Sequence, residues 1–126
     1  MKRVTGIGGI FFKANDPAKL QSWYAKHLGI VPRQDGSVSF AWGSDDAKVG
    51  HTIWAPFPSD TEYFAPSSAP FMINYRVENL DALLEQLHLE GVEIDPKRET
   101  GEFGKFAWIM DPEGNRIELW EPAAGW

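Results

Sequence analysis

The stretch that decides the fold is Asp111-Pro112-Glu113-Gly114-Asn115, followed at once by Arg116-Ile117-Glu118-Leu119-Trp120. The first five residues predict a tight turn, because proline suits the second position of a turn and glycine accepts a positive φ. The next five residues are mostly apolar or aromatic and predict a β-strand. Alternation along that strand places Glu118 on the same face as Arg116 and Trp120.

The residues before that turn belong to an internal repeat. Phe106-Ala107-Trp108 repeats Phe40-Ala41-Trp42 at an offset of 66 residues, and the same ungapped offset lays Trp54 on Trp120. The helical stretches upstream align at an offset of 63, and short differences in loop length absorb the drift. We therefore interpret the chain as a duplication of one structural unit.

Each half predicts one amphipathic helix between strands. In the first half Asp16 is a helix cap and Gly29 supplies a left-handed stop, and in the second half Asn79 and Gly91 take these roles. A strand-like run precedes each helix, and shorter β-rich segments follow it. The clearest of these strands are residues 8–13, 51–54, 71–77 and 116–120. Each half therefore has the order βαβββ.

The two units are expected to form one domain over residues 1–126, because each half alone is too short to bury a stable core. The first module covers about residues 1–56 and the second about residues 71–126, with a proline-rich linker over residues 57–70. The aromatic residues of the linker are Phe57, Tyr63 and Phe64. They either cover the binding side of the domain or pack on a second subunit.

Composition excludes several classes of protein. The chain carries 12 Lys and Arg against 18 Asp and Glu, a net charge of -6 that argues against binding to nucleic acid or to an anionic membrane. The absence of cysteine rules out disulfides and thiolate chemistry, and a cytoplasmic protein is expected. Six Trp, eight Phe and three Tyr indicate either a dense core or a pocket lined with aromatic rings.

The repeat and its motifs resemble the vicinal oxygen chelate superfamily, which includes glyoxalase I, bleomycin-resistance proteins and extradiol dioxygenases. The resemblance rests on Gly6 to Asp16, Trp23 to Gly29, Phe71 to Val77 and the Asp111 to Trp120 stretch. It implies an α+β fold in which two βαβββ modules form a cup-shaped sheet. It also implies a ligand on the concave side and a homodimer.

The enzymes of that superfamily hold a divalent metal in the cup, with one ligand from the first and one from the last strand of each module. The positions in this sequence that match are Gly9, Thr52, Met72 and Glu118, of which Glu118 alone is a good ligand. His51 adjoins Thr52, but the repeat places it on the opposite strand face, so Glu118 with His51 is only the weaker alternative. We therefore expect no cofactor, with a divalent metal as the other possibility.

Glu118 is the candidate catalytic residue, either as a general base or as a hydrogen-bond acceptor for a ligand, and a structural ion pair is the alternative. The candidate ligand-binding residues share the predicted cup face or its aromatic walls. They are Phe11, Trp54, Met72, Asn74, Arg76 and Trp120.

Two functions remain open. The first is a protein of the bleomycin-resistance kind that binds a small organic molecule in an aromatic-lined cup without a metal. The second is a metal-dependent lyase or isomerase resembling glyoxalase I, or a dioxygenase-related enzyme, acting on an α-oxygenated carbonyl compound. Whether the chain is an enzyme stays open, and metal stoichiometry separates the two functions.

Overall fold

The computed structural model describes residues 2–43 and 50–126, and in them the chain forms seven strands and two helices. In chain order the elements are β1 (Val4–Ala14), α1 (Pro17–Leu28), β2 (Val38–Ala41), β3 (His51–Pro58), β4 (Phe71–Val77), α2 (Leu80–Leu89), β5 (Ile94–Gly101), β6 (Gly104–Met110) and β7 (Arg116–Pro122). This content confirms the predicted α+β class. Within the described residues, neither helix is long and apolar enough to cross a membrane.

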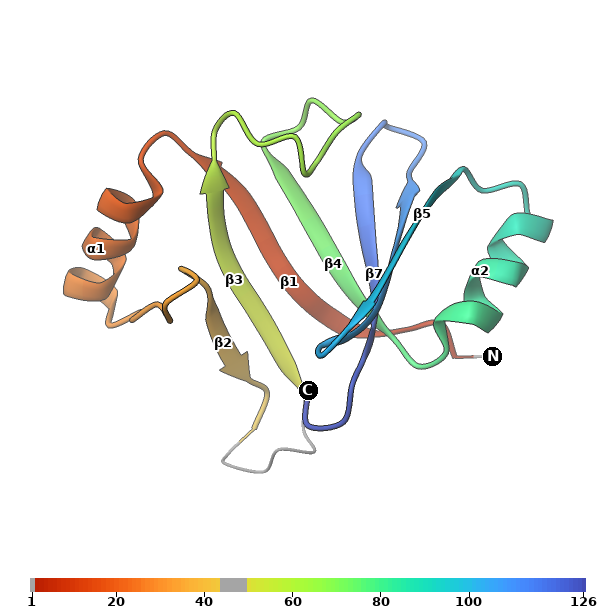
Figure 1. Ribbon diagram of the computed structural model, residues 1–126, viewed down its shortest axis with the longest axis horizontal. Helices are drawn as coiled ribbons and strands as arrows, with labels where there is room; N and C mark the ends of the chain where they lie inside the picture. The colour runs from red at the N-terminus through yellow and green to blue at the C-terminus, as the bar shows by residue number, and fades with distance from the viewer. Residues whose placement is uncertain (1, 44–49) are drawn as a thin grey trace.

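All the strands lie in one sheet, in the order β2-β3-β1-β4-β7-β6-β5. At its centre β1 and β4 are antiparallel neighbours, and each is flanked by a parallel strand of its own half, β3 beside β1 and β7 beside β4. Figure 1 shows α1 at one end of this arrangement and α2 at the other, with β5 curling across the front of β7. The two halves therefore pair within one chain and build one concave surface.

The helices begin and end where the sequence predicts. The Asp16 carboxylate accepts a hydrogen bond from a backbone N–H of the first turn of α1, and the Asn79 side chain does the same for α2. Gly29 and Gly91 follow the two helices with φ values of 69° and 80°, which end the helical path at low cost.

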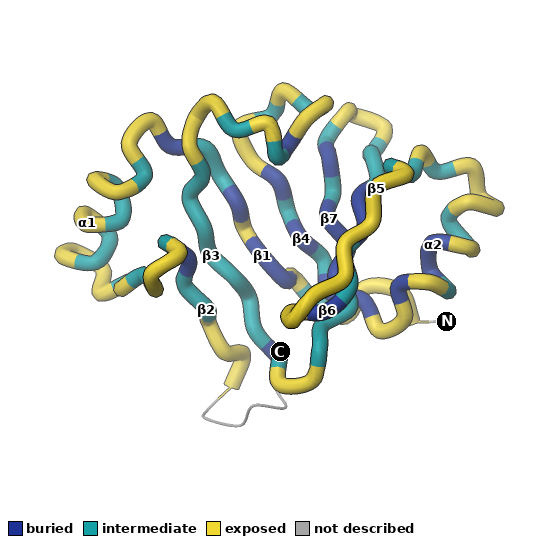
Figure 2. Tube along the Cα trace, viewed as in Figure 1, coloured by how far each residue is buried: buried dark blue, intermediate teal, exposed yellow. Residues whose placement is uncertain are grey.

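The two helices differ in how deeply they pack. Three leucines of α2, at positions 80, 83 and 84, are buried in a cluster with Val77 and Leu119. No residue of α1 is buried, and its main aromatic contact is Tyr24 against Trp54, with ring centroids 5.0 Å apart. Figure 2 shows this difference as buried segments along α2 and exposed segments along α1. The main apolar core behind the sheet therefore belongs to the second half.

The first half departs from the expected βαβββ order in one segment. Among its described residues two strands follow the helix, where the second half has three. The place of the missing strand is taken by a turn in which the Arg33 N–H donates to the Ser37 carbonyl and the Gly36 N–H donates to the Arg33 carbonyl. These local hydrogen bonds occupy backbone groups that a strand would offer to a neighbour.

The linker crosses one end of the concave face. β3 continues to Pro58, so the connecting segment begins two residues later than the sequence indicates. Phe64 is fully buried in a second apolar cluster with Phe11, Met72 and Trp108, and Tyr63 packs against this cluster. Of the two roles considered for the linker aromatics, the structure therefore shows the covering of the cup.

The β5–β6 hairpin gives a test of the fold. Gly104 has a φ of 124°, and a Cβ there would overlap the Glu121 carbonyl oxygen and stand 2.7 Å from the Ala123 nitrogen. Gly104→Ala should therefore lower the free energy of unfolding by about 1 to 3 kcal/mol, measured by guanidinium denaturation. Gly101→Ala is the matched control, because its Cβ would meet no atom within 4 Å. Equal losses in both variants would contradict the strand geometry described here.

Candidate functional site

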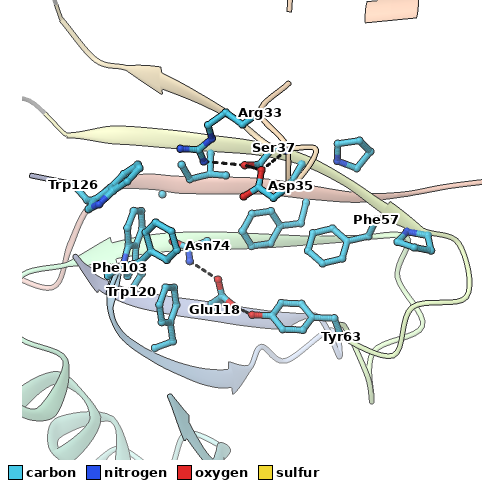
Figure 3. Close-up of a pocket in the computed structure, with 17 residues that line it drawn as sticks. Arg33, Asp35, Ser37, Phe57, Tyr63, Asn74, Phe103, Glu118, Trp120 and Trp126 are labelled. Atoms are coloured by element: carbon cyan, nitrogen blue, oxygen red, sulfur yellow. Dashed lines mark hydrogen bonds between the residues drawn. The ribbon is translucent and has the colours of Figure 1, made fainter. Parts of the chain in front are cut away.

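The concave face holds a cavity of about 470 Å³. It is open to solvent, and most of its wall is apolar (Figure 3). Its aromatic residues come from β1, β3, the linker, the β5–β6 hairpin, β7 and the segment after β7. They are Phe11, Phe57, Tyr63, Phe103, Phe106, Trp120 and Trp126. A cavity of this size and lining is typical of a small-molecule site.

Glu118 of β7 is the acid at the base of this cavity, and it is 1% exposed. Its Oε1 accepts a hydrogen bond of 2.6 Å from Asn74 Nδ2 of β4. Its Oε2 accepts one of 2.5 Å from the Tyr63 hydroxyl and one of 3.0 Å from Trp108 Nε1 of β6. Figure 3 shows the bonds from Asn74 and Tyr63. Three donors from three parts of the chain therefore hold one carboxylate.

The electrostatics of Glu118 are set by burial. Loss of solvent raises the pKa of its carboxyl above the ordinary value, although the hydrogen bonds from Tyr63, Asn74 and Trp108 act in the opposite direction. Burial, together with the charge of Glu118, also raises the pKa of the Tyr63 hydroxyl. Tyr63 therefore stays protonated and remains a donor to Glu118.

A row of paired residues crosses the centre of the sheet at the level of Glu118. β7 and β4 pair Glu118 with Asn74, β4 and β1 pair Asn74 with Gly9, and β1 and β3 pair Gly9 with Ile53. Directly paired residues of neighbouring strands point to the same face of a sheet. The positions facing the cup at this level are therefore Gly9, Ile53, Asn74 and Glu118.

This row corrects the sequence alignment at two positions. The sequence placed Thr52 and Met72 at this level, where the structure has Ile53 and Asn74. The pairs Gly9–Ile53 and Asn74–Glu118 both join residues 44 apart, so both halves share one register. The sequence alignment matched β1 with β4 at an offset of 63 residues and β3 with β7 at an offset of 66 residues. These offsets differ by an odd number, so the alignment assigned the side chains of β3 to the wrong face of the sheet.

His51 therefore lies on the cup face of β3, and its predicted place on the opposite face is wrong. It is two residues from Ile53, and residues two apart in a strand share a face. Its Nδ1 lies 3.0 Å from the Ser39 hydroxyl, and its ring packs on Trp126 with centroids 5.5 Å apart. These contacts describe a histidine held by protein groups at the cup's end.

The residues present do not fit the divalent metal that the resemblance implies. The central row offers one carboxylate, one amide, one alkyl side chain and a glycine, and both carboxylate oxygens already accept hydrogen bonds. Among the described residues, no group of three or more His, Asp or Glu side chains could hold a metal ion. A stable site needs three or more such ligands.

The structure brings together four of the candidate ligand-binding and catalytic residues. Phe11, Asn74, Glu118 and Trp120 line the cavity, as the sequence predicts for the cup face. The remaining three lie elsewhere. Met72 is on the cup face but is fully buried in the cluster with Phe64, and it does not line the cavity.

The structure also contradicts the prediction that Trp54 and Arg76 line the cavity. Trp54 points away from the cup and packs against Phe12 and Tyr24. The sequence alignment was in error by one residue along β3 and therefore assigned Trp54 to the wrong face. Arg76 is on the cup face, but its guanidinium is stacked between Trp42 and Trp120, with 4.9 and 5.0 Å to the ring centroids. It supports the Trp120 wall from behind rather than lining the cavity.

Sequence reasoning missed several lining residues. The rim is formed by Arg33, Asp35 and Ser37, in which Arg33 donates to the Ser37 hydroxyl and that hydroxyl donates to Asp35. No strand or helix pattern marks this turn as part of a site. Trp108 was recognised as half of a repeated pair, but only the tertiary structure brings its indole N–H to Glu118.

Several solved structures share the fold of this chain. A methylmalonyl-CoA epimerase from Mycobacterium tuberculosis is 22% identical, with a TM-score of 0.65 over 98% of this chain and 91% of that chain. A variant of the Streptomyces coelicolor methylmalonyl-CoA epimerase, in complex with 2-nitronate-propionyl-CoA, is 17% identical, with a TM-score of 0.70 over 96% and 99%. A superfamily member from Vibrio splendidus 12B01 is 12% identical, with a TM-score of 0.56 over 91% and 97%. At these identities the likeness concerns the fold.

Sequence comparison gives the family directly. A search of curated proteins found no match to this chain. The family model described as Glyoxalase/Bleomycin resistance protein/Dioxygenase superfamily matches residues 6–119, which is most of the chain. The matched range includes both helices, the central strands and Glu118. The chain therefore belongs to the glyoxalase/bleomycin resistance protein/dioxygenase superfamily.

Proposed function

We propose that this chain binds a small, largely apolar organic molecule in the cup without the help of a metal. The observation that carries this proposal is an aromatic-walled cavity of about 470 Å³ with Glu118 at its bottom. Both carboxylate oxygens of Glu118 already accept hydrogen bonds from protein donors. A metal in this row would gain one carboxylate as its one good protein ligand.

The walls favour a planar ligand with one or two rings. Phe106 and Trp120 are stacked with an interplanar angle of 4°, and Phe57 and Tyr63 are stacked with an angle of 16°. Phe103 and Trp126 meet edge to face near the mouth. Flat apolar surfaces on several sides contact an aromatic or conjugated carbonyl compound over a large area.

A second function, metal-free proton transfer, is supported by the position of Glu118. In its ionised form it could take a proton from a carbon next to a carbonyl group and return it from the same side to another atom of the resulting enolate, which is an isomerase reaction. The structural likeness to methylmalonyl-CoA epimerases agrees with this chemistry. Because Glu118 is 1% exposed and held by Tyr63, such a reaction requires that the Tyr63 bond opens first.

The metal-dependent lyase or isomerase remains the less favoured enzyme, because the central row supplies Glu118 alone as a good ligand.

The expected homodimer and the cytoplasmic location stay predictions. Light scattering at micromolar concentration measures the mass that decides between monomer and dimer.

The cavity wall gives the first prediction. Phe103→Ala should weaken binding of 2-methoxynaphthalene by about three- to tenfold, because one aromatic face of the mouth is lost. The measurement is isothermal titration calorimetry. Phe40→Ala is the matched control, because Phe40 is exposed to a similar degree, 45% against 39%, and does not line the cavity. Equal effects of the two substitutions would remove the cavity from the proposal.

Metal content gives the second prediction. Protein incubated with nickel, zinc or manganese and passed through gel filtration should retain far less than one ion per chain, because Glu118 would have to hold the ion almost alone. Elemental analysis measures the ratio. A value near one ion per chain that is lost in Glu118→Ala would favour the metal-dependent enzyme.

The raised pKa of Glu118 gives the third prediction. Because the folded-state pKa lies above the ordinary value of 4.5, the neutral acid stabilises the folded protein, and this contribution is lost as pH rises through the folded-state pKa. As pH rises above 4.5, the stability of Glu118→Gln should therefore rise relative to the wild type. Urea denaturation at several pH values measures the trend, with Glu113→Gln as the control for loss of an exposed carboxylate. A constant difference between Glu118→Gln and the wild type would contradict the burial argument.

A further inference from the structure

Asn74 has one side-chain atom that the network at Glu118 leaves without a partner. Its Nδ2 donates to Glu118, but its Oδ1 is buried and accepts no hydrogen bond from any described residue. When Glu118 is ionised, its carboxylate only accepts hydrogen bonds, so the Nδ2 group of the amide must face it. The oxygen therefore points away from Glu118.

Gly8 is the residue that this oxygen faces. A Cβ built on Gly8 would overlap Asn74 Oδ1, and it would also stand 2.9 Å from Trp120. Gly8, Asn74 and Trp120 all line the cavity. The missing side chain of Gly8 therefore leaves space in the wall for the Asn74 carbonyl beside the Trp120 ring.

An unpartnered acceptor at this depth is costly. Asn74 is 1% exposed, and a buried polar group without a partner costs about 1 to 3 kcal/mol. The atom lies on the central row beside Glu118, where a ligand in the cup would be surrounded by aromatic walls. A donor on the ligand would recover this energy, whereas an apolar group at the same place would leave the cost in place.

We propose that the cup selects ligands that carry a hydroxyl or N–H group on a planar ring system, and that Asn74 Oδ1 accepts this hydrogen over Gly8. This inference rests on the proposed binding function and adds the polar group that the ligand must carry. Glu118 acts through Asn74, because its carboxylate holds the amide with the oxygen toward Gly8. Asn74 is then the residue that determines specificity, and Glu118 is a positioning residue.

The test uses two pairs of probes that differ only in the donor. They are 2-naphthol with 2-methoxynaphthalene, and indole with 1-methylindole, each titrated into the wild-type protein by calorimetry. The donor-bearing member of each pair should bind about tenfold more tightly, the usual value of one hydrogen bond to a buried acceptor. Equal affinities within both pairs would overturn the inference and leave the binding function standing. Failure of all four probes to bind would overturn both.

The variant Asn74→Leu removes the acceptor. It should lose the preference for the donor-bearing probes, so that the two members of each pair bind with equal affinity. Gln86→Leu, on α2, is the matched control, because it replaces an amide outside the cavity with the same alkyl group. A preference that persists in Asn74→Leu would overturn the inference.

A second measurement needs no variant, in case Asn74→Leu does not fold. The side-chain amide signals of Asn74 in ¹⁵N-labelled wild-type protein should shift on addition of 2-naphthol and much less on addition of 2-methoxynaphthalene. Equal shifts with both probes would overturn the assignment of the donor to Asn74.

Discussion

The burial of the Glu118 carboxylate is the constraint on which the site depends. A carboxylate at 1% exposure is tolerated only when protein groups replace its water, and here Tyr63, Asn74 and Trp108 do so. These donors come from the linker, from β4 and from β6. The acid therefore ties the linker to both neighbouring strands.

The pairing of two similar halves creates the cavity, but the halves contribute differently. The second half supplies the acid, two of its three donors and the main core behind the sheet, with Leu80 and Val77 among its buried residues. The first half supplies apolar wall from β1 and β3, and its helix α1 buries no residue. A duplicated sequence has thus produced one polar centre rather than two, because Gly9 and Ile53 stand where the second half has Asn74 and Glu118.

Aromatic side chains take two distinct places around that centre. Phe11, Phe64 and Trp108 form the cluster that closes one end of the cup, whereas Phe103 and Trp126 stand at its mouth. Behind the aromatic residues at the mouth, the Arg76 guanidinium stacks on the Trp120 ring. The faces of the two indole rings stabilise the positive charge of the buried guanidinium in place of water. This cation therefore lies beneath an apolar wall.

The sequence by itself determined the repeat, both helices with their caps and the acid at position 118, because turns, caps and periodicity are local properties. It also placed Met72, Asn74 and Arg76 on one face of β4, since alternation is local as well. Only the tertiary structure showed which side chains of β3 face the cup. Those of His51 and Ile53 do, whereas those of Thr52 and Trp54 point to the opposite face of the sheet. The register between β1 and β3 depends on strand pairing over 44 residues, and an error of one residue in an alignment reverses the face. Tyr63 reaches Glu118 from a distance of 55 residues along the chain, a contact that no local pattern encodes.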